Sequence, residues 1–397
     1  MTESVTANMR ENGKTVKLFY QDSHLKEFEA KVVSCGESGD HYEAELDCTA
    51  FFPEGGGQYA DTGTIGSVRV LDVQEKDGRV LHITDAPLIP GEKVAGRIDW
   101  AERFMKMQQH TGEHIVSGLV HARLGYNNVG FHLGSEDCTM DFDGEITPEE
   151  LRDIEKKANR AVWENLEVQV LYPSEKELAE IDYRSKIEIE GQVRIVVIPG
   201  YDVCACCAPH VKETGSVGLI KIVGAVHYKG GMRVSILCGF RALEDYRMKE
   251  RNVTEISNLL SAKQEDTAQA VEHLGQELNR QKEKNKALQE RYVALCLENI
   301  RKNKEPEENI FLFEEELDPA ARRDFVNKAM EMTQGLAGVF VGADDSGYQY
   351  VLGSRRPDIQ ETGKKLNARF QGKGGGRPPM IQGSLKGNEQ EIREFLK

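Results

Sequence analysis

Two histidines one helical turn apart are the first residues of this sequence whose types and spacing could bind a metal ion. His110 and His114 occur in the segment His-Thr-Gly-Glu-His, and residues four apart lie on the same face of a helix. Two imidazoles in that arrangement suit a single metal ion. The order differs from the zincin pattern His-Glu-x-x-His, because Glu113 precedes the second histidine. A metalloprotease-type general base is therefore not indicated.

A second pair, Cys206 and His210, follows about ninety residues later. Cysteine and histidine together form the ligand set that Zn²⁺ prefers, so the two pairs predict one zinc ion. The spacing leaves open which of three neighbouring thiols is the ligand, that of Cys204, Cys206 or Cys207. It also leaves open whether the zinc is structural, with four protein ligands, or catalytic, with one position open to water or substrate.

The elements around these pairs predict an α+β fold. Short β-type segments divided by turns fill the first hundred residues and indicate a small barrel or sandwich. The apolar spacing then becomes helical from 101 to 124, which places His110 and His114 on a helix. Thr147-Pro148 is a typical start of a second helix. Strand-like segments return after it and continue to about residue 240, where this unit is expected to end.

The second half of the chain begins with a segment that is nearly free of glycine and proline. Apolar residues recur there at three- and four-residue steps, and polar residues such as Gln281 and Asn285 interrupt the pattern. This predicts a helical hairpin or weak coiled coil, with a helix docked on its own domain as the alternative.

Strand and helix patterns alternate again in the last part of the chain. The predicted domains are a barrel-like subdomain (1–100), a zinc-binding α/β domain (101–240), a helical connector (241–303) and a C-terminal α/β domain (304–397).

Composition and charge set limits on the function. The 397 residues include 51 basic and 66 acidic ones, a net charge of −15 that argues against a generally basic surface for nucleic acid. Between residues 355 and 386, however, eight basic residues stand against two acidic ones.

The mean hydropathy of −0.52 and the lack of long apolar runs predict a soluble chain. The N-terminal residues lack a secretory signal, which places the chain in the cytoplasm, where its cysteines are expected to be reduced.

Several motifs follow one another in a fixed order along the first part of the chain. They are Thr49 to Gln58 with its Pro-Glu-Gly-Gly-Gly-Gln turn, Asp61-Thr-Gly63, Ile98-Asp-Trp100, His110 to His114, and Cys206 to His210 followed by Thr214-Gly215. In order and spacing they resemble the editing domain of alanyl-tRNA synthetase, and more closely the freestanding alanyl-tRNA editing proteins called AlaX. The resemblance covers about residues 15 to 245. Further along the chain, the segment 372–378, Gly-Lys-Gly-Gly-Gly-Arg-Pro, is similar to the glycine-rich signature of the DHHA1 domain. With no aminoacylation domain in front, this order matches the long AlaX class.

The resemblance implies an enzyme that acts in trans on mischarged tRNA(Ala). It would hydrolyse the ester that joins serine, and as a second candidate glycine, to this tRNA, and thereby maintain translational fidelity. By position, His110, His114, Cys206 and His210 take the roles of the zinc ligands. The alternative is a non-catalytic tRNA-binding protein whose zinc is purely structural. A homodimer formed through the connector or the C-terminal domain is also expected.

Three further residues are assigned to the catalytic site. Thr49 matches the threonine that the family associates with amino-acid discrimination, and a hydroxyl there would hydrogen-bond serine but not alanine. Gln58 ends the glycine turn, where the alternative is an exposed turn residue. His132 stands where the synthetases have a glutamine and is assigned in place of that amide, the alternative being a core histidine. For tRNA binding, backbone amides and basic side chains are expected to meet phosphate at Lys373, Gly374, Gly375, Gly376 and Arg377.

Overall fold

The computed structural model describes residues 13–135, 137–185, 192–303 and 309–397, and the structural statements below concern these residues. The predicted α+β class is confirmed. The chain divides into two compact units, Met1–Asn252 and Val253–Lys397, which are described separately. The finer division into four domains stays a prediction. Residues 304–308, with which the last predicted domain begins, lie outside the described residues.

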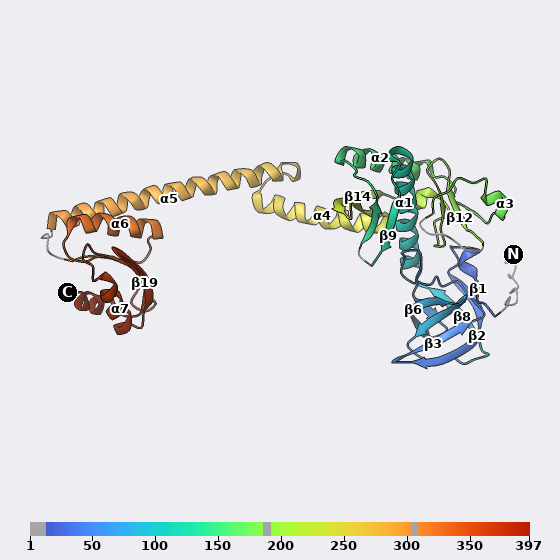
Figure 1. The fold of residues 1–397 in the computed structure, drawn as a ribbon, viewed down its shortest axis with the longest axis horizontal. Helices are drawn as coiled ribbons and strands as arrows, with labels where there is room; N and C mark the ends of the chain where they lie inside the picture. Colours follow the sequence, from blue (N-terminus) through green and yellow to red (C-terminus); the bar gives the residue numbers. More distant parts are fainter. Residues whose placement is uncertain (1–12, 136, 186–191, 304–308) are drawn as a thin grey trace. The chain divides into compact units, whose positions relative to one another are not determined.

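The first unit begins with a closed barrel of six antiparallel strands (Figure 1). Alternate residues of its longest strand are buried in the barrel core, among them Phe28, Ala30 and Val32, as the two-residue period of a strand requires. A short parallel pair, β1 (Val16–Lys17) and β4 (Cys48–Thr49), is also present. In barrel order the strands are β2 (Glu27–Ser38), β3 (His41–Leu46), β7 (Arg79–Thr84), β6 (Val68–Lys76), β5 (Gly63–Ile65) and β8 (Lys93–Ile98).

A fully buried histidine, His82, gives the barrel a pH-dependent stability. The carbonyl of Ala44 accepts from Nδ1 at 3.1 Å, so Nε2 accepts from the Thr49 hydroxyl at 2.9 Å. Burial lowers the pKa of His82 to about 4. The unfolded chain, with a pKa of about 6.5, binds this proton at a higher pH than the folded protein, so stability falls as the pH drops through that window.

We expect His82→Gln to flatten the dependence of unfolding free energy on pH between about 6.5 and 4. Each unit of pKa difference corresponds to about 1.4 kcal/mol, so the wild type should lose roughly 3 kcal/mol over this range. Urea unfolding at several pH values measures the slope. A variant with the wild-type slope would contradict the assignment.

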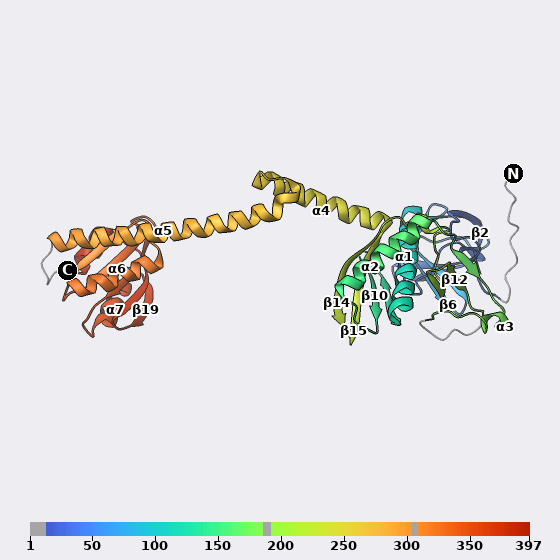
Figure 2. The same cartoon turned by 90° about the horizontal axis from the view of Figure 1, so that it is seen from above.

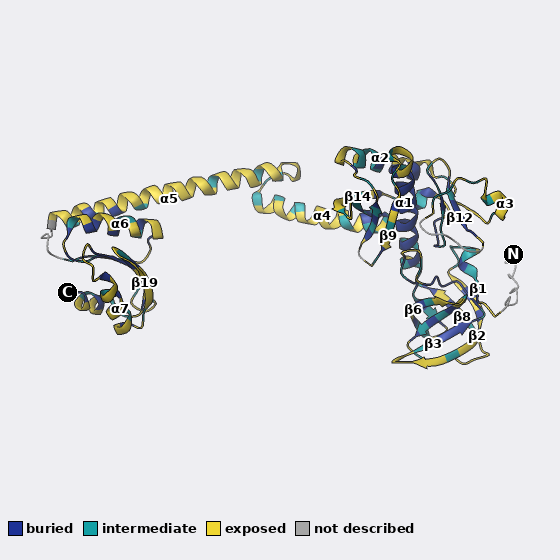
Figure 3. Ribbon diagram, viewed as in Figure 1, coloured by how far each residue is buried: buried dark blue, intermediate teal, exposed yellow. Residues whose placement is uncertain are grey.

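After the barrel, a long helix forms the centre of the first unit. Helix α1 (Trp100–Leu124) lies between two sheets, one containing β9 and one containing β12 (Figures 1 and 2), and most of its residues are buried (Figure 3). The four-stranded sheet consists of β14 (Ile220–Tyr228), β15 (Gly231–Cys238), β10 (Cys138–Phe142) and β9 (Asn128–Leu133). The three-stranded sheet consists of β11 (Gln169–Leu171), β12 (Ile195–Ile198) and β13 (Asp202–Ala205).

Shorter helical elements complete the first unit. Helix α2 (Pro148–Glu164) begins at Thr147-Pro148, as the sequence predicts. The structure adds a capping box, in which the side chains of Thr147 and Glu150 each accept a hydrogen bond from the backbone N–H of the other residue. The remaining elements of this unit are the 3₁₀ turns η1 (Leu18–Tyr20) and η2 (Thr214–Val217), and helix α3 (Glu175–Leu178).

The glycine turn connects the barrel to β9. The Leu133 amide donates a hydrogen bond to the Gly57 carbonyl at 2.8 Å. Gln58 and Leu133 form an isolated parallel β-bridge. Gly57 has a φ of +79°, and a Cβ there would lie 2.5 Å from the Phe131 carbonyl oxygen. Glycine therefore permits a close backbone approach here that a side chain would prevent. The contact places Gln58 against α1, with only 1% of its surface exposed.

A buried charge network also ties the barrel to α1. The Asp61 carboxylate accepts from Arg103 Nε at 2.8 Å, and Lys106 Nζ lies 3.7 Å from the same carboxylate. Arg103 also donates to the backbone carbonyls of Ala50 and Ser23, at 2.6 and 3.1 Å. Arg103, Lys106 and Asp61 are all at most 1% exposed. Asp61 thus contacts two cations of the helix that carries the histidine pair, and Glu102 is a second acid, 3.4 Å from the Lys106 ammonium.

Helix α4 (Gly239–Leu260) follows β15, and the second unit continues with the 3₁₀ turn η3 (Gln264–Asp266) and the 37-residue helix α5 (Thr267–Asn303). Most of α5 is exposed (Figure 3). A five-stranded sheet follows, with helices α6 (Pro319–Met332), α7 (Ile359–Arg369) and α8 (Glu389–Phe395). Its strands, in order, are β16 (Ile310–Glu314), β17 (Ala337–Ala343), β18 (Gly347–Gly353), β20 (Met380–Leu385) and β19 (Lys373–Arg377).

The glycine-rich segment of the second unit is itself the edge strand β19. In the part of the chain that the structure describes it pairs with β20 alone, and all five of its residues are exposed. Sequence reasoning gave no strand here, because glycine weakens strand interiors. The outer edge of β19 leaves backbone N–H groups next to the side chains of Lys373 and Arg377. Among the described residues, no helix is long and apolar enough to cross a bilayer.

Candidate metal centre and its cavity

The two predicted pairs of metal ligands come together in the first unit. His110 and His114 lie on the buried face of α1, with their rings stacked 5.5 Å apart. Cys206 and His210 lie on the loop that follows β13. Their ligand atoms all lie within 4.8 Å of one another, and the Cys206 sulfur is 3.4 Å from His110 Nε2. The geometry is that of a compact three-histidine, one-cysteine cluster.

Two polar side chains fix the orientation of the helical histidines. Gln58 Oε1 lies 3.0 Å from Nδ1 of His110, and Asp202 Oδ2 lies 2.8 Å from Nδ1 of His114. Both partners are oxygen acceptors and hold the proton on Nδ1, so the neutral form of each ring has Nε2 available for a metal. Arg184 Nε bonds Asp202 in turn, at 2.8 Å.

The third histidine provides a test of whether the cluster fits a metal ion. Both ring nitrogens of His210 are buried and make no regular hydrogen bond with the described residues. The Cys206 sulfur is close enough to interact with this ring electrostatically. Buried polar atoms are normally paired, and a metal ion bound by His210 would supply the missing partner. Three imidazoles and one thiol are also a ligand set that Zn²⁺ prefers, so the residues present fit the ion.

The electrostatics distinguish Cys206 from its two neighbours. Burial alone would raise the pKa of the Cys206 thiol, but the electrostatic interaction with His110 and the close contacts of the three imidazoles with the sulfur lower it well below its usual value. Burial raises the pKa of Cys204 and of Cys207 to about 11. Burial also lowers the pKa of His210 to about 3, which keeps this ring neutral. A thiolate and neutral imidazoles are the protonation states that bind metal.

The cluster lies in the wall of a cavity of about 660 Å³. The glycine turn contributes Gly56 and Gly57 to the lining, and Phe131, Tyr20 and Tyr172 are its aromatic members. The Phe131 ring lies 4.7 Å from the His110 ring, centroid to centroid. A small molecule or the end of a larger one can therefore reach the ligand atoms of the cluster.

The three residues predicted to be catalytic lie in different places. Gln58 is buried and bonds His110, so the alternative of an exposed turn residue does not apply. Thr49 does not line the cavity, since its hydroxyl donates to His82 and accepts from the Phe51 amide at 3.1 Å inside the barrel. His132 is exposed on β9, with its side chain 65% accessible, and is not part of the lining. The alternative of a core histidine does not apply to it.

Sequence reasoning missed Asp202 and Arg194. The only available signal for Asp202 was its position two residues before Cys204, since its contact with His114 spans 88 positions. Arg194 donates from Nη1 to the backbone carbonyls of Cys206 and Ala208, at 2.7 and 3.1 Å. It thereby supports the loop that carries Cys206 and His210.

Gln58 provides a test of the cluster that does not depend on activity. We expect Gln58→Leu to weaken zinc binding about 10- to 100-fold, because His110 loses the acceptor that fixes its tautomer. Gln58→Glu keeps an oxygen acceptor and should lose much less. Competition with a chromophoric chelator measures both affinities, and equal zinc affinity in the leucine variant and the wild type would contradict the assignment.

Two family models match the sequence. The second additional domain of threonyl and alanyl tRNA synthetases matches residues 193–235, which include the loop with Cys206 and His210. The DHHA1 domain matches residues 307–397, which include β19.

Curated relatives match a larger part of the chain. The alanyl-tRNA editing protein Aarsd1 of Rattus norvegicus is 27% identical over 92% of this chain and 93% of its own length. The Danio rerio protein of the same name is 26% identical over 95% and 96%. An alanine–tRNA ligase of Ignicoccus hospitalis is 35% identical over 66% of this chain but only 30% of its own length. The chain thus spans less than half of that ligase.

Proposed function

The chain is homologous to the alanyl-tRNA editing proteins over nearly its whole length, and from this premise we propose that it is a hydrolase that deacylates mischarged tRNA(Ala). The bond broken is the ester between the amino acid and the terminal ribose. Serine is the proposed amino acid, with glycine as the second candidate. The observation that carries the proposal is the histidine–cysteine cluster in the wall of a 660 Å³ cavity. A purely structural zinc site has no need of such a cavity, which speaks against the non-catalytic alternative.

The chain's own residues suit this reaction. His110, His114, Cys206 and His210 would hold one Zn²⁺, which when bound would orient the ester and stabilise charge on its oxygen. Four protein ligands leave little room for a water ligand, so we favour this positioning role. Phe131 shields the cluster from solvent on one side. The rings of Tyr20 and Tyr172 offer surfaces on which the terminal base can stack.

Rejection of alanine requires a polar group that pairs with the serine hydroxyl. The role of Thr49 stays a prediction, and its hydroxyl hydrogen is already used by His82. Ser185 and Gln192 are polar residues that do line the cavity, and we propose them as further candidates. The role of His132 also stays a prediction, as does a homodimer through the connector or the C-terminal domain.

A single-turnover assay tests the proposed function. Serine, glycine and alanine esters of tRNA(Ala) are each mixed with excess protein, with and without a chelator. We expect the serine ester to be cleaved roughly 100-fold or more faster than the alanine ester, as hydrogen-bond-based rejection allows, and the chelator to stop the cleavage. Binding of all three esters without cleavage would support the non-catalytic alternative instead.

The exposed edge strand β19 is the proposed contact for the tRNA backbone. Lys373 and Arg377 flank three glycines there, in the segment where basic residues outnumber acidic ones. We expect the double substitution Lys373→Gln, Arg377→Gln to weaken tRNA binding and to reduce the slope of log Kd against log salt by up to about 2, one for each lost phosphate contact. Titrations at several salt concentrations measure this, and an unchanged slope would refute the contact.

A further inference from the structure

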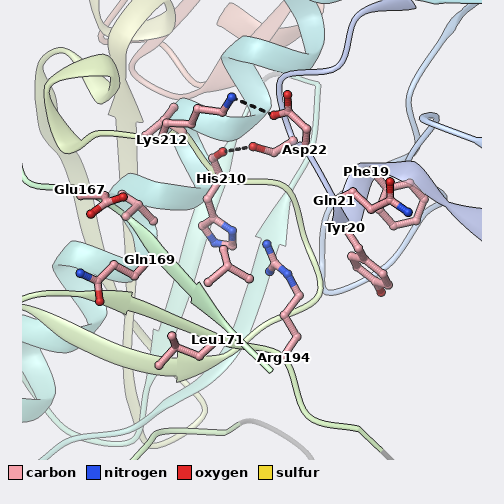
Figure 4. A pocket seen from close by; sticks show the side chains of 14 residues that line it. Phe19, Tyr20, Gln21, Asp22, Glu167, Gln169, Leu171, Arg194, His210 and Lys212 are labelled. Carbon is pink, nitrogen blue, oxygen red and sulfur yellow. Dashed lines mark hydrogen bonds and ion pairs between the residues drawn. The ribbon is translucent and has the colours of Figure 1, made fainter. Parts of the chain in front are cut away.

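A second cavity, of about 400 Å³, shares two residues with the cavity at the histidine–cysteine cluster. It lies between the η1 turn and strand β11, and Tyr20 and Arg194 line both cavities. His210 lines only the second one. Figure 4 shows the Arg194 guanidinium and the His210 ring next to each other within it. Arg194 therefore faces both the cluster and a space into which a longer substrate can extend.

Arg194 is a buried cation that is only partly paired. It is 8% exposed. Within the described ranges, Nη1 is the only guanidinium nitrogen for which a hydrogen bond is found, and its acceptors are the carbonyls of Cys206 and Ala208. Nε is buried and has no partner among the described residues. No carboxylate of the described chain lies within ion-pair distance of it. The fork formed by Nε and Nη2 is the edge with which arginine binds phosphate or carboxylate groups in a bidentate manner.

The neighbouring charges do not neutralise Arg194. Asp22 pairs with Lys212 at 3.0 Å at the rim of the cavity, so these two side chains balance each other (Figure 4). Glu167 also lines the cavity, but it is exposed and makes no ion pair with Arg194. The Tyr20 ring lies 5.8 Å from the guanidinium and offers only a weak cation–π contact. A bound Zn²⁺ would add positive charge next to it, so a buried cation without a carboxylate indicates an anionic ligand.

We propose that Arg194 binds the phosphodiester that precedes the terminal nucleoside of the substrate, and that the second cavity is the phosphate subsite. This inference rests on the proposed function. It adds that the enzyme recognises the nucleotide chain next to the ester, through an anion held directly beside the metal-binding loop. In a mischarged RNA this phosphate is the anion nearest the ester. Arg194 thus connects recognition of the RNA end to the position of the reacting bond.

Paired substrates that differ only in this phosphate test the proposal. Seryl-tRNA carries the phosphodiester, and seryl-adenosine, with serine esterified to the ribose, carries none. We expect Arg194→Gln to lower kcat/KM for seryl-tRNA about 10- to 100-fold, the value of a hydrogen bond between charged groups. For seryl-adenosine the loss should be less than about threefold. The exposed Arg160→Gln on α2 is the matched control and should change neither value.

The possible outcomes separate three explanations. An equal loss on both substrates, with zinc content reduced, means that Arg194 only supports the metal-binding loop, and this overturns the proposal. An equal loss with full zinc content means that Arg194 acts on the ester itself, which also overturns it. If the wild type cleaves neither substrate, the proposed function has failed, irrespective of any variant.

A measurement on the wild-type protein covers the case in which Arg194→Gln does not fold. Adenosine 5′-monophosphate carries the phosphate that the subsite should bind, and adenosine does not. We expect the monophosphate to inhibit cleavage of seryl-adenosine at concentrations about tenfold or more below those of adenosine. Equal inhibition by the two compounds would overturn the subsite.

Discussion

Cys206→Ser should abolish both zinc retention and ester hydrolysis, whereas Cys204→Ser and Cys207→Ser should retain both. The Cys206 sulfur lies 3.4 Å from His110 Nε2, in the middle of the three imidazoles. Serine at this position is a hard, protonated ligand, in contrast to the thiolate that Zn²⁺ prefers. Loss of a residue that only supports a ligand costs about 10- to 100-fold in metal affinity, so loss of the ligand itself should cost more than 100-fold.

The neighbouring thiols make matched controls within the same loop. Cys204 is buried on β13 and belongs to a second possible group, with His114 and Asp202. In that group Nδ1 of His114 already bonds Asp202, which argues against a metal there. Cys207 lines the cavity, and burial keeps its pKa at about 11.

Zinc content by atomic spectroscopy and single-turnover rates on seryl-tRNA decide among the three cysteine variants. If Cys204→Ser loses zinc while Cys206→Ser retains it, the metal belongs to the second group. If Cys206→Ser loses zinc but still cleaves the ester, the zinc is structural and the catalytic assignment is wrong.

The ligand pairs could be predicted from sequence because each pair is local. His110 and His114 need only a helix, and Cys206 and His210 need only one loop, so spacing alone brings each pair together. The residues that orient them are set by contacts between distant segments. Gln58 reaches His110 only because the glycine turn docks on β9, where Gly57 passes within van der Waals distance of Phe131. No periodicity in the sequence encodes that contact.

Position in a motif was a weaker guide to where a side chain points. Thr49 lies in the expected segment, but the barrel core holds its hydroxyl between His82 and the Phe51 amide. His132 lies beside Phe131, and the alternation of a strand directs Phe131 to the cavity and His132 to the opposite face. The glycine-rich segment 373–377 is a further case in which local sequence is a weak guide to structure. It forms a strand because it pairs with β20, which its glycine content alone would not predict.

The stability of the first unit should depend strongly on Asp61. Arg103 and Lys106 project from α1 into the junction with the barrel, and both are fully buried. Asp61 is the carboxylate that bonds Arg103, and it also accepts from the Phe52 amide at 2.7 Å. Removal of one partner from a buried ion pair leaves an uncompensated charge, which typically costs about 3 to 5 kcal/mol.

We therefore expect Asp61→Ala to lower the free energy of unfolding by about 3 to 5 kcal/mol. Asp61→Asn keeps the shape but not the charge and should recover only part of the loss. The matched control is Glu27→Ala, which breaks the exposed Glu27–Arg97 pair of the same barrel at 3.0 Å and should cost less than about 1 kcal/mol. Urea unfolding followed by tryptophan fluorescence measures all three, because Trp100 begins α1. If Asp61→Ala cost no more than the control, Arg103 and Lys106 would be neutralised by other groups, and the barrel would be held to α1 by apolar packing and the glycine turn alone.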